Sequence, residues 1–321
     1  MKNNFEFWTH FAEFLTYLEL PPRSDGLEKN PFSMLISKHF ASKIKKGDWN
    51  DPLLRQVLPS IAELREVKGF EDDPVGDEES VQEDGILQKY VGRALVIATP
   101  ACSIHCRFCF RRNFPFHADP TLTDRLDRWL EKHSDIHEVI LSGGDPLMLD
   151  NETFQNLVSV ILKHKSVGTL RIHTRIPVTL PQQLLNTEKS SHFICLQQAA
   201  TQKQVVLVSH VNHPQELDDE SHKVFQHLRG IGVTLLNQSV LLKGVNDNVQ
   251  TLVALSHKLF EQGVLPYYIH QLDHAKGVAH FEVEDVRAIK LMNEIRNLLP
   301  GYLVPRLVRE RPHDGSKQPL F

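Results

Sequence analysis

Short apolar runs that alternate with helical patterns are the feature that most constrains the fold of this 321-residue chain. Near-continuous apolar strands that are joined by helical crossovers form parallel sheets covered by helices. Apolar residues at helical spacing recur between the runs, for example over 122–130 and 286–295. The six runs are Ala94–Ala98, Glu138–Leu141, Thr169–Ile172, Val205–Val208, Gly232–Leu236 and Pro266–Ile269.

This alternation predicts an α/β protein whose parallel strands curl into an incomplete (β/α)6 barrel, because crossovers are right-handed and the strands are uniform. A doubly wound open sheet is the alternative. The predicted organisation has three parts: an N-terminal helical region with an acidic linker over 1–87, the partial barrel over 88–300, and a short segment over 301–321 that closes the site.

Two segments before the barrel have clear patterns of their own. Residues 5–19 predict an amphipathic helix whose aromatic stripe is core, and the pattern stops at Pro21. The acidic run Glu71–Ser80 has no periodicity, so we expect a solvated linker or a surface loop. The stripe consists of Phe5, Trp8, Phe11, Phe14, Leu15 and Leu18.

Charge and composition exclude several classes of function. Lys plus Arg number 36 against 40 Asp plus Glu, and the formal net charge of −4 disfavours a general binder of nucleic acid or anionic membranes. No run of eighteen apolar residues suggests a membrane span, and the first residues do not resemble a signal peptide. Four cysteines, three of them clustered, fit a reducing compartment, so we expect a cytoplasmic protein. Because the net charge disfavours large anionic partners, we expect small-molecule ligands.

The clustered cysteines are Cys102, Cys106 and Cys109, with the spacing Cys-x3-Cys-x2-Cys. Three thiolates suit a 4Fe-4S cluster that keeps one iron open, whereas a structural zinc site is closed by four protein ligands. A zinc site with His105 as its fourth ligand and a group of ordinary buried thiols are the alternatives. The fourth cysteine, Cys195, lies in an apolar run and is expected to be a buried thiol.

Polar residues follow every predicted strand, at the edge where active sites of parallel barrels collect. Their repetition on six strands predicts one site at this rim. The glycines of Ser142–Asp145 could bring backbone close to a ligand and leave amides free, although the segment alone also reads as a capped turn. The segments are the cysteine loop, Ser142–Asp145, His173–Arg175, His210–His213, Asn237–Ser239 and His270–Asp273, and ligand contact is an open possibility for His173, His210, His213 and His270.

Arg111 and Arg112 follow the last clustered cysteine. A guanidinium there could bind a carboxylate through two parallel hydrogen bonds. The alternative is a surface pair that balances acidic neighbours.

Five segments in order carry a family resemblance: Cys106–Arg112, Ser142–Leu147, Arg171–Pro181, Asn237–Asp247 and Pro266–Asp273. They resemble the lysine 2,3-aminomutase family of radical S-adenosylmethionine enzymes, and the likeness covers about residues 88–321. The short chain is most similar to the branch that makes β-lysine for the modification of elongation factor P.

The resemblance implies conversion of L-α-lysine to β-lysine by a radical 1,2-amino shift. It implies three cofactors, a 4Fe-4S cluster, S-adenosylmethionine and pyridoxal 5'-phosphate, together with an electron donor and a ligase that passes the product to elongation factor P. The zinc-binding extension of longer aminomutases has no counterpart here, so zinc is not expected.

The resemblance also implies a role for particular residues, including Lys317 as the lysine that carries pyridoxal phosphate. Without the resemblance, the position of this lysine near the end of the chain would predict a solvated tail residue. The implied cofactor residues are Cys102, Cys106 and Cys109 for the cluster; Ser142, Gly143, Gly144, Asp145 and Gln238 for S-adenosylmethionine; and Lys317, Tyr90, Arg93 and Arg175 for pyridoxal phosphate.

For the substrate, the resemblance implies that Arg111 pairs with the carboxylate of lysine, and that Asp273 and Glu310 receive its ε-ammonium. Glu310 stands where related enzymes carry Asp. Two alternatives remain: a radical enzyme of the same cofactor type that acts on another amino acid, such as glutamate or arginine, and a non-enzymatic zinc-binding module.

Overall fold

The structure is a computed structural model that describes residues 6–22, 30–115, 117, 119–185 and 191–320. The described residues form one ten-stranded sheet with the strand order β12-β11-β10-β9-β8-β7-β6-β5-β4-β3. Every neighbouring pair from β5 to β11 is parallel, which confirms the predicted α/β class. The strands are β3 (Val81–Glu83), β4 (Ile86–Tyr90), β5 (Arg93–Thr99), β6 (Glu138–Gly143), β7 (Thr169–Thr174), β8 (Gln204–His210), β9 (Thr234–Val240), β10 (Leu265–His270), β11 (Arg306–Arg309) and β12 (Gln318–Pro319).

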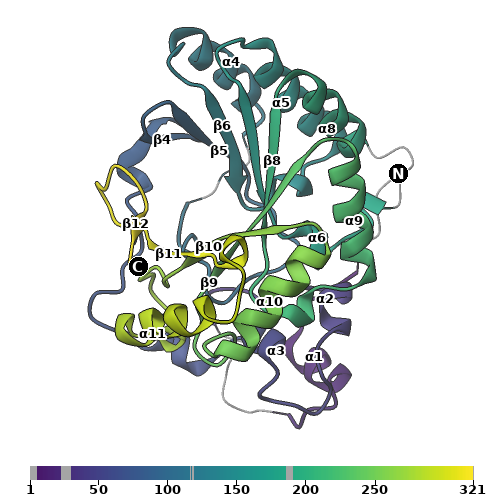
Figure 1. The fold of residues 1–321 in the computed structure, drawn as a ribbon, viewed down its shortest axis with the longest axis vertical. Coiled ribbons are helices and arrows are strands. Elements are labelled where there is room, and N and C mark those ends of the chain that lie inside the picture. The colour runs from purple at the N-terminus through teal and green to yellow at the C-terminus, as the bar shows by residue number, and fades with distance from the viewer. Residues whose placement is uncertain (1–5, 23–29, 116, 118, 186–190, 321) are drawn as a thin grey trace.

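The sheet curves strongly, so its two ends meet. Lys89 on β4 and Glu310, directly after β11, form an ion pair of 3.2 Å although six strands lie between β4 and β11 in the sheet. Figure 1 shows the yellow C-terminal strands close to blue β4. An incomplete barrel is therefore present, and it is extended beyond the six predicted strands by parallel β11 and by antiparallel β3, β4 and β12.

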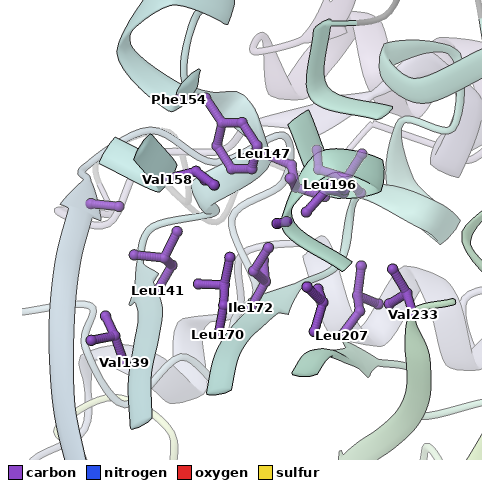
Figure 2. Packing of buried hydrophobic residues seen from close by; sticks show 14 of the residues in the cluster. Val139, Leu141, Leu147, Phe154, Val158, Leu170, Ile172, Leu196, Leu207 and Val233 are labelled. Carbon is purple, nitrogen blue, oxygen red and sulfur yellow. The ribbon is translucent and has the colours of Figure 1, made fainter. Parts of the chain in front are cut away.

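Helices cover the outer face of the parallel strands (Figure 1). Figure 2 shows Leu141 and Ile172 on neighbouring strands beneath Phe154 and Val158 of α5, all of them fully buried. Burial of one such side chain stabilises the fold by about 1.5–3 kcal/mol. No helix within the described ranges is long and apolar enough to span a membrane. The helices are α1 (Phe11–Tyr17), α2 (Lys38–Ser42), α3 (Pro52–Val57), α4 (Leu122–Lys132), α5 (Asn151–Lys163), α6 (Ile176–Thr179), α7 (Gln182–Leu185), α8 (Ser191–Gln202), α9 (Asp219–Gly230), α10 (Val249–Glu261) and α11 (Asp285–Arg296).

The N-terminal region differs in part from the helix predicted over 5–19. Helix α1 begins only at Phe11, because β1 (Phe7–Trp8) pairs with β2 (Ile36–Ser37) and its backbone is extended. The stripe of Phe14, Leu15 and Leu18 is buried, as predicted. Phe5 lies outside the described residues.

The N-terminal region also holds the cysteine loop from outside the barrel. The amide of His105 donates to the Leu35 carbonyl at 2.8 Å, and the amide of Arg107 donates to the Gln56 carbonyl at 2.8 Å. The side chain of Arg107 is fully buried in an ion pair with Glu63, at 2.5 Å. The described part of the N-terminal region thereby fixes the shape of the loop through protein contacts, a role that the sequence did not predict.

The acidic run Glu71–Ser80 is exposed at several positions, as expected of a surface loop, but it is buried at two others. Val75 and Asp77 are 3% and 1% exposed, whereas the Asp72 side chain is 58% exposed. The run is therefore mixed, with one carboxylate turned into the barrel, and Asp77 is buried because two cations meet it there.

Candidate functional site

A cavity of about 320 Å³ opens at the carboxyl ends of the parallel strands. It is lined by all the residues to which the resemblance assigns a role in binding cofactors or substrate, although they come from strands and loops spread over most of the chain. The predicted residues on its wall are Tyr90, Arg93, Cys102, Cys106, Cys109, Arg111, Ser142, Gly143, Gly144, Asp145, Arg175, Gln238, Asp273, Glu310 and Lys317.

The three thiols of the cysteine loop lie on one side of this cavity. Burial and, to a lesser extent, the neighbouring Cys106 raise the pKa of the Cys109 thiol to about 11. Burial also raises the pKa of Cys102 well above its usual value, with the charges of Asp145 and the other two cysteines adding to the effect. A bound cationic centre reverses this balance, because it stabilises thiolates.

The donor set fits an iron–sulfur cluster better than a single ion. His105 turns away from the thiols, with its Nδ1 at 3.0 Å from the Ser33 carbonyl and its ring stacked on Phe32. In the part of the chain that the structure describes, no group of three or more His, Cys, Asp and Glu side chains has a geometry that could hold a single metal ion. Three soft donors that face a cavity leave the fourth position of a cluster open to a ligand.

The glycines after β6 act differently from our prediction. A Cβ on Gly144 would lie 2.3 Å from the Ala101 carbonyl oxygen, so only glycine lets β6 approach the start of the cysteine loop. The amides are not free, because Gly144 donates to the Thr99 carbonyl and Asp145 donates to the Ala101 carbonyl, both at 2.7 Å. The close approach is to the cysteine loop, and the predicted free amides were wrong.

The carboxylate of Asp145 is similarly engaged by the protein. It accepts hydrogen bonds from the Thr174 hydroxyl at 2.7 Å, from the Arg175 amide at 2.7 Å and from the Leu147 amide at 3.1 Å. Burial raises its pKa to about 6 although these donors favour the charged form. The side chain thus ties the exit of β6 to the exit of β7, and contact with a ligand stays a prediction.

Arg175 lies beside the thiols, a position that the sequence did not predict. Its Nη1 donates to Cys106 Sγ at 2.8 Å, and its Nη2 pairs with Glu216 at 2.7 Å. Its Nε donates to the His210 carbonyl at 3.2 Å. Contact with a coenzyme phosphate stays a prediction.

The two arginines after the cysteines separate into two roles. Arg111 lines the cavity, where its Nε donates to Asp77 at 2.6 Å and its Nη1 donates to the Ser142 hydroxyl at 3.1 Å. Arg112 pairs with buried Glu63 at 2.7 Å and is itself only 4% exposed at its side chain. Arg112 is therefore a structural partner of the N-terminal region and not the surface charge of our alternative.

Lys317 lies in a folded segment and not in a solvated tail. The strands on either side of it pair, with Arg309 opposite Gln318, and the Leu320 amide donates to the Leu307 carbonyl at 3.0 Å. Lys317 Nζ donates to Glu310 Oε2 at 2.6 Å, and its side chain is 22% exposed.

Tyr90 and Arg93 lie at the same end of the cavity, with the guanidinium 4.8 Å from the ring centre. Burial and the nearby Glu310 carboxylate raise the pKa of Tyr90 well above its usual value. The hydroxyl therefore stays a hydrogen-bond donor at neutral pH.

Two acids with opposite pKa shifts share this end of the cavity. Burial alone would raise the pKa of Glu310, but Lys317 and Lys89 hold it well below its usual value. Burial and the charge of Glu310 raise the pKa of Asp273 to about 7. One carboxylate is thus ionised and the other stands near half-protonation at neutral pH, an arrangement that a further cation would complete.

Several polar atoms in the cavity lack a hydrogen-bond partner within the described part of the chain. They include His173 Nε2, His270 Nε2 and Asp273 Oδ1, all buried. Buried polar atoms are normally satisfied, so their orientation toward one cavity fits a polar ligand. His173 Nδ1 lies 3.3 Å from Nε2 of Gln238, on β9.

The remaining histidines of the rim have structural contacts. His210 stacks on Phe108 at 5.5 Å between ring centres and also lines the cavity. The ring of His213 accepts a hydrogen bond from the Gln215 amide at 3.2 Å and caps a short turn. Cys195 is 5% exposed, as predicted for a buried thiol.

Sequence reasoning missed Asp77, Lys89 and Arg171, which also line the cavity. Arg171 pairs with Glu138 at 2.6 Å across neighbouring strands. Lys89 directly precedes Tyr90 on β4. Its position next to this predicted site residue was the one sequence signal that could have indicated Lys89. Asp77 lies in the acidic run, where composition suggested solvent.

Comparison with known proteins agrees with this site. Residues 96–255 match the family model of the radical SAM superfamily. The L-lysine 2,3-aminomutase of Haemophilus influenzae is 42% identical over 89% of this chain and 84% of its own length. That of Escherichia coli is 42% identical over 91% and 84%, and that of Buchnera aphidicola is 39% identical over 89% and 83%.

The fold and the three-cysteine cavity define a radical SAM protein. The sequence identity to the three aminomutases extends over most of this chain and most of each relative. The chain therefore belongs to the lysine 2,3-aminomutase family.

Proposed function

We propose that this protein converts L-lysine to β-lysine by a radical 1,2-amino shift. One observation carries the proposal: a single cavity joins three cysteine thiols to Lys317, Arg111 and two carboxylates. A lysine substrate has one carboxylate and two amines, so it needs a guanidinium, an aldehyde-bearing coenzyme and acids at its far end.

The cofactors of this reaction match the donors in the cavity. A 4Fe-4S cluster fits Cys102, Cys106 and Cys109, and S-adenosylmethionine fits the open position beside Ser142 and Gln238. Pyridoxal 5'-phosphate fits the end of the cavity that holds Lys317, Tyr90 and Arg93, and the predicted segment Ser142–Asp145 forms the wall between. When bound, the cluster and S-adenosylmethionine supply a radical and pyridoxal phosphate spreads the unpaired electron.

The protein's own residues bind, orient and protect the substrate. Arginine has five N–H donors, and two of those of Arg111 bond Asp77 and Ser142, so others can bind the substrate carboxylate. Asp273 and Glu310 bind the ε-ammonium, the former losing its proton as it does so. Phe108 and Leu272 are apolar parts of the wall and limit water around the reacting carbon.

The setting of the reaction follows from the same proposal. An external electron donor reduces the cluster, and the protein works in the reducing cytoplasm, consistent with four free cysteines. The resemblance to the short branch of the family supports delivery of β-lysine to a ligase that modifies elongation factor P.

An amino-acid panel tests the proposed function. Protein that is purified and reconstituted without oxygen receives S-adenosylmethionine, pyridoxal phosphate and a reductant, and products are identified by mass spectrometry and chromatography. Lysine should give β-lysine. Glutamate should stay unchanged because two acids face its side chain, and arginine should stay unchanged because its cationic side chain is longer and bulkier than that of lysine. Isomerised glutamate would overturn the assignment of Asp273 and Glu310, and zinc without iron would favour the non-enzymatic alternative.

The raised pKa of Asp273 predicts how lysine binding depends on pH. Only the ionised carboxylate pairs with an ammonium, and the pKa is about 7, so affinity should rise as pH increases through neutrality. Between pH 6 and pH 8 the gain should be about tenfold. Calorimetry with lysine and with norleucine, which lacks the ε-ammonium, isolates this effect. Norleucine should show no such gain, and Asp273→Asn should remove the gain for lysine.

A further inference from the structure

The buried carboxylate of Asp77 joins two cations, Arg111 and Lys89, that both line the cavity. Its Oδ2 accepts from Nε of Arg111 at 2.6 Å, and its Oδ1 lies 2.6 Å from Nζ of Lys89. Burial alone would raise the pKa of Asp77, but Arg111 and Lys89 hold it below its usual value. Asp77 is therefore an anion that faces both partners.

Lys89 continues this chain of charges from Asp77 to Glu310. Its Nζ lies 3.2 Å from Glu310 and donates to the Val75 carbonyl at 2.9 Å, and its side chain is 16% exposed. Glu310 in turn pairs with Lys317. Charges of alternating sign thus run from Arg111 through Asp77, Lys89 and Glu310 to Lys317.

The loop that carries Asp77 is fixed in place by short-range contacts. The carboxylate of Asp73 accepts hydrogen bonds from the amides of Asp77 and Glu78, both at 2.9 Å. Gly76 has a φ of +67°, and a Cβ there would lie 3.3 Å from Pro312, just before the segment of Lys317. Asp77 and Lys89 form a bridge between Arg111 and Glu310, and this bridge consequently has little freedom to lengthen.

We propose that Asp77 and Lys89 are positioning residues that fix the separation between Arg111 and Glu310 and so select a substrate of lysine length. The inference rests on the proposed function, in which Arg111 binds the carboxylate and Glu310 the ε-ammonium. Ornithine, one methylene shorter, cannot reach both groups while the bridge is intact. One methylene commonly changes specificity by about 10- to 200-fold.

The bridge acts on both ends of the substrate. Without the charge of Asp77, Arg111 loses the partner that orients its guanidinium at Nε. Lys89 loses one of its two anions as well, and it then moves fully onto Glu310, where it competes with the substrate ammonium. Both changes reduce the advantage of lysine over a shorter diamino acid.

The test measures lysine against ornithine in the reconstituted holoenzyme, by dissociation constants from calorimetry and by kcat/KM. Asp77→Asn should lower the preference for lysine at least about tenfold, mainly through KM. Asp77→Glu restores the charge and should recover part of the preference. Asp72→Asn, in the same acidic run but on an exposed side chain paired with Lys276, is the matched control and should keep it.

Lys89→Gln approaches the bridge from the other side and leaves the contact between Asp77 and Arg111 in place, so it also serves if Asp77→Asn does not fold. It should lower the same preference. A merely structural role would reduce binding of lysine and ornithine equally. If the wild type isomerises lysine and both variants keep its preference, the bridge is wrong and the proposed function stands; if the wild type does not accept lysine, both fall.

Discussion

Replacing Lys317 with alanine should abolish the borohydride-reducible adduct with pyridoxal phosphate and lower the rate of lysine isomerisation by more than about 1,000-fold. The physical reason is that Lys317 places a primary amine in the cavity, 2.6 Å from Glu310 and held between two paired strands. The adduct is measured by absorbance and by peptide mapping after reduction, and the rate by product analysis.

Two control variants separate the chemistry of Lys317 from its charge. Lys317→Arg keeps a cation beside Glu310 but cannot form the adduct, so it should be as inactive as the alanine variant. Lys276→Ala removes an exposed lysine that pairs with Asp72 and should behave as the wild type. Lys89 is the other amine beside Glu310, so an adduct that persisted and mapped to Lys89 would contradict the assignment.

The architecture could be predicted from the sequence because parallel strands and their helices leave local patterns. Each of the six predicted strands is present, and each of the six predicted rim segments supplies at least one residue to the wall of one cavity. Strand β11 was missed because Arg306–Arg309 carries two arginines and reads as polar. Helix α1 was predicted too long because Trp8 takes part in a pairing with residues almost thirty positions later, which periodicity does not show.

The sequence predicted which residues line the candidate site more fully than it predicted the contacts between them. Arg175 was expected at a phosphate, but its partners include Cys106 and Glu216, which are distant in sequence. Asp77 lies in a run whose composition suggested solvent, and only Arg111 and Lys89 explain its burial. Spacing identifies which side chains reach a strand end, whereas their hydrogen bonds depend on loops that meet only after folding.

Replacing Cys106 with alanine should remove the iron–sulfur absorbance and reduce cleavage of S-adenosylmethionine to about 1% of the wild-type rate or less, because two thiolates cannot hold an open cluster. Cys106 also accepts a hydrogen bond from Arg175 at 2.8 Å, but Arg175 keeps Glu216 as its ion-pair partner in the variant. Iron content and the absorbance spectrum are measured after anaerobic reconstitution, together with release of the cleavage product.

The fold should survive this change, and that makes the loss informative. The cysteine loop is held from outside by the amides of His105 and Arg107 and by the buried pair of Arg107 with Glu63, none of which needs Cys106. The melting temperature of the unreconstituted protein should therefore stay close to that of the wild type. Cys195→Ala, which alters a buried thiol outside the cavity, is the matched control and should retain its iron and its activity. An intact cluster in Cys106→Ala, or loss of the cluster in Cys195→Ala, would show that Cys102, Cys106 and Cys109 are not the ligand set.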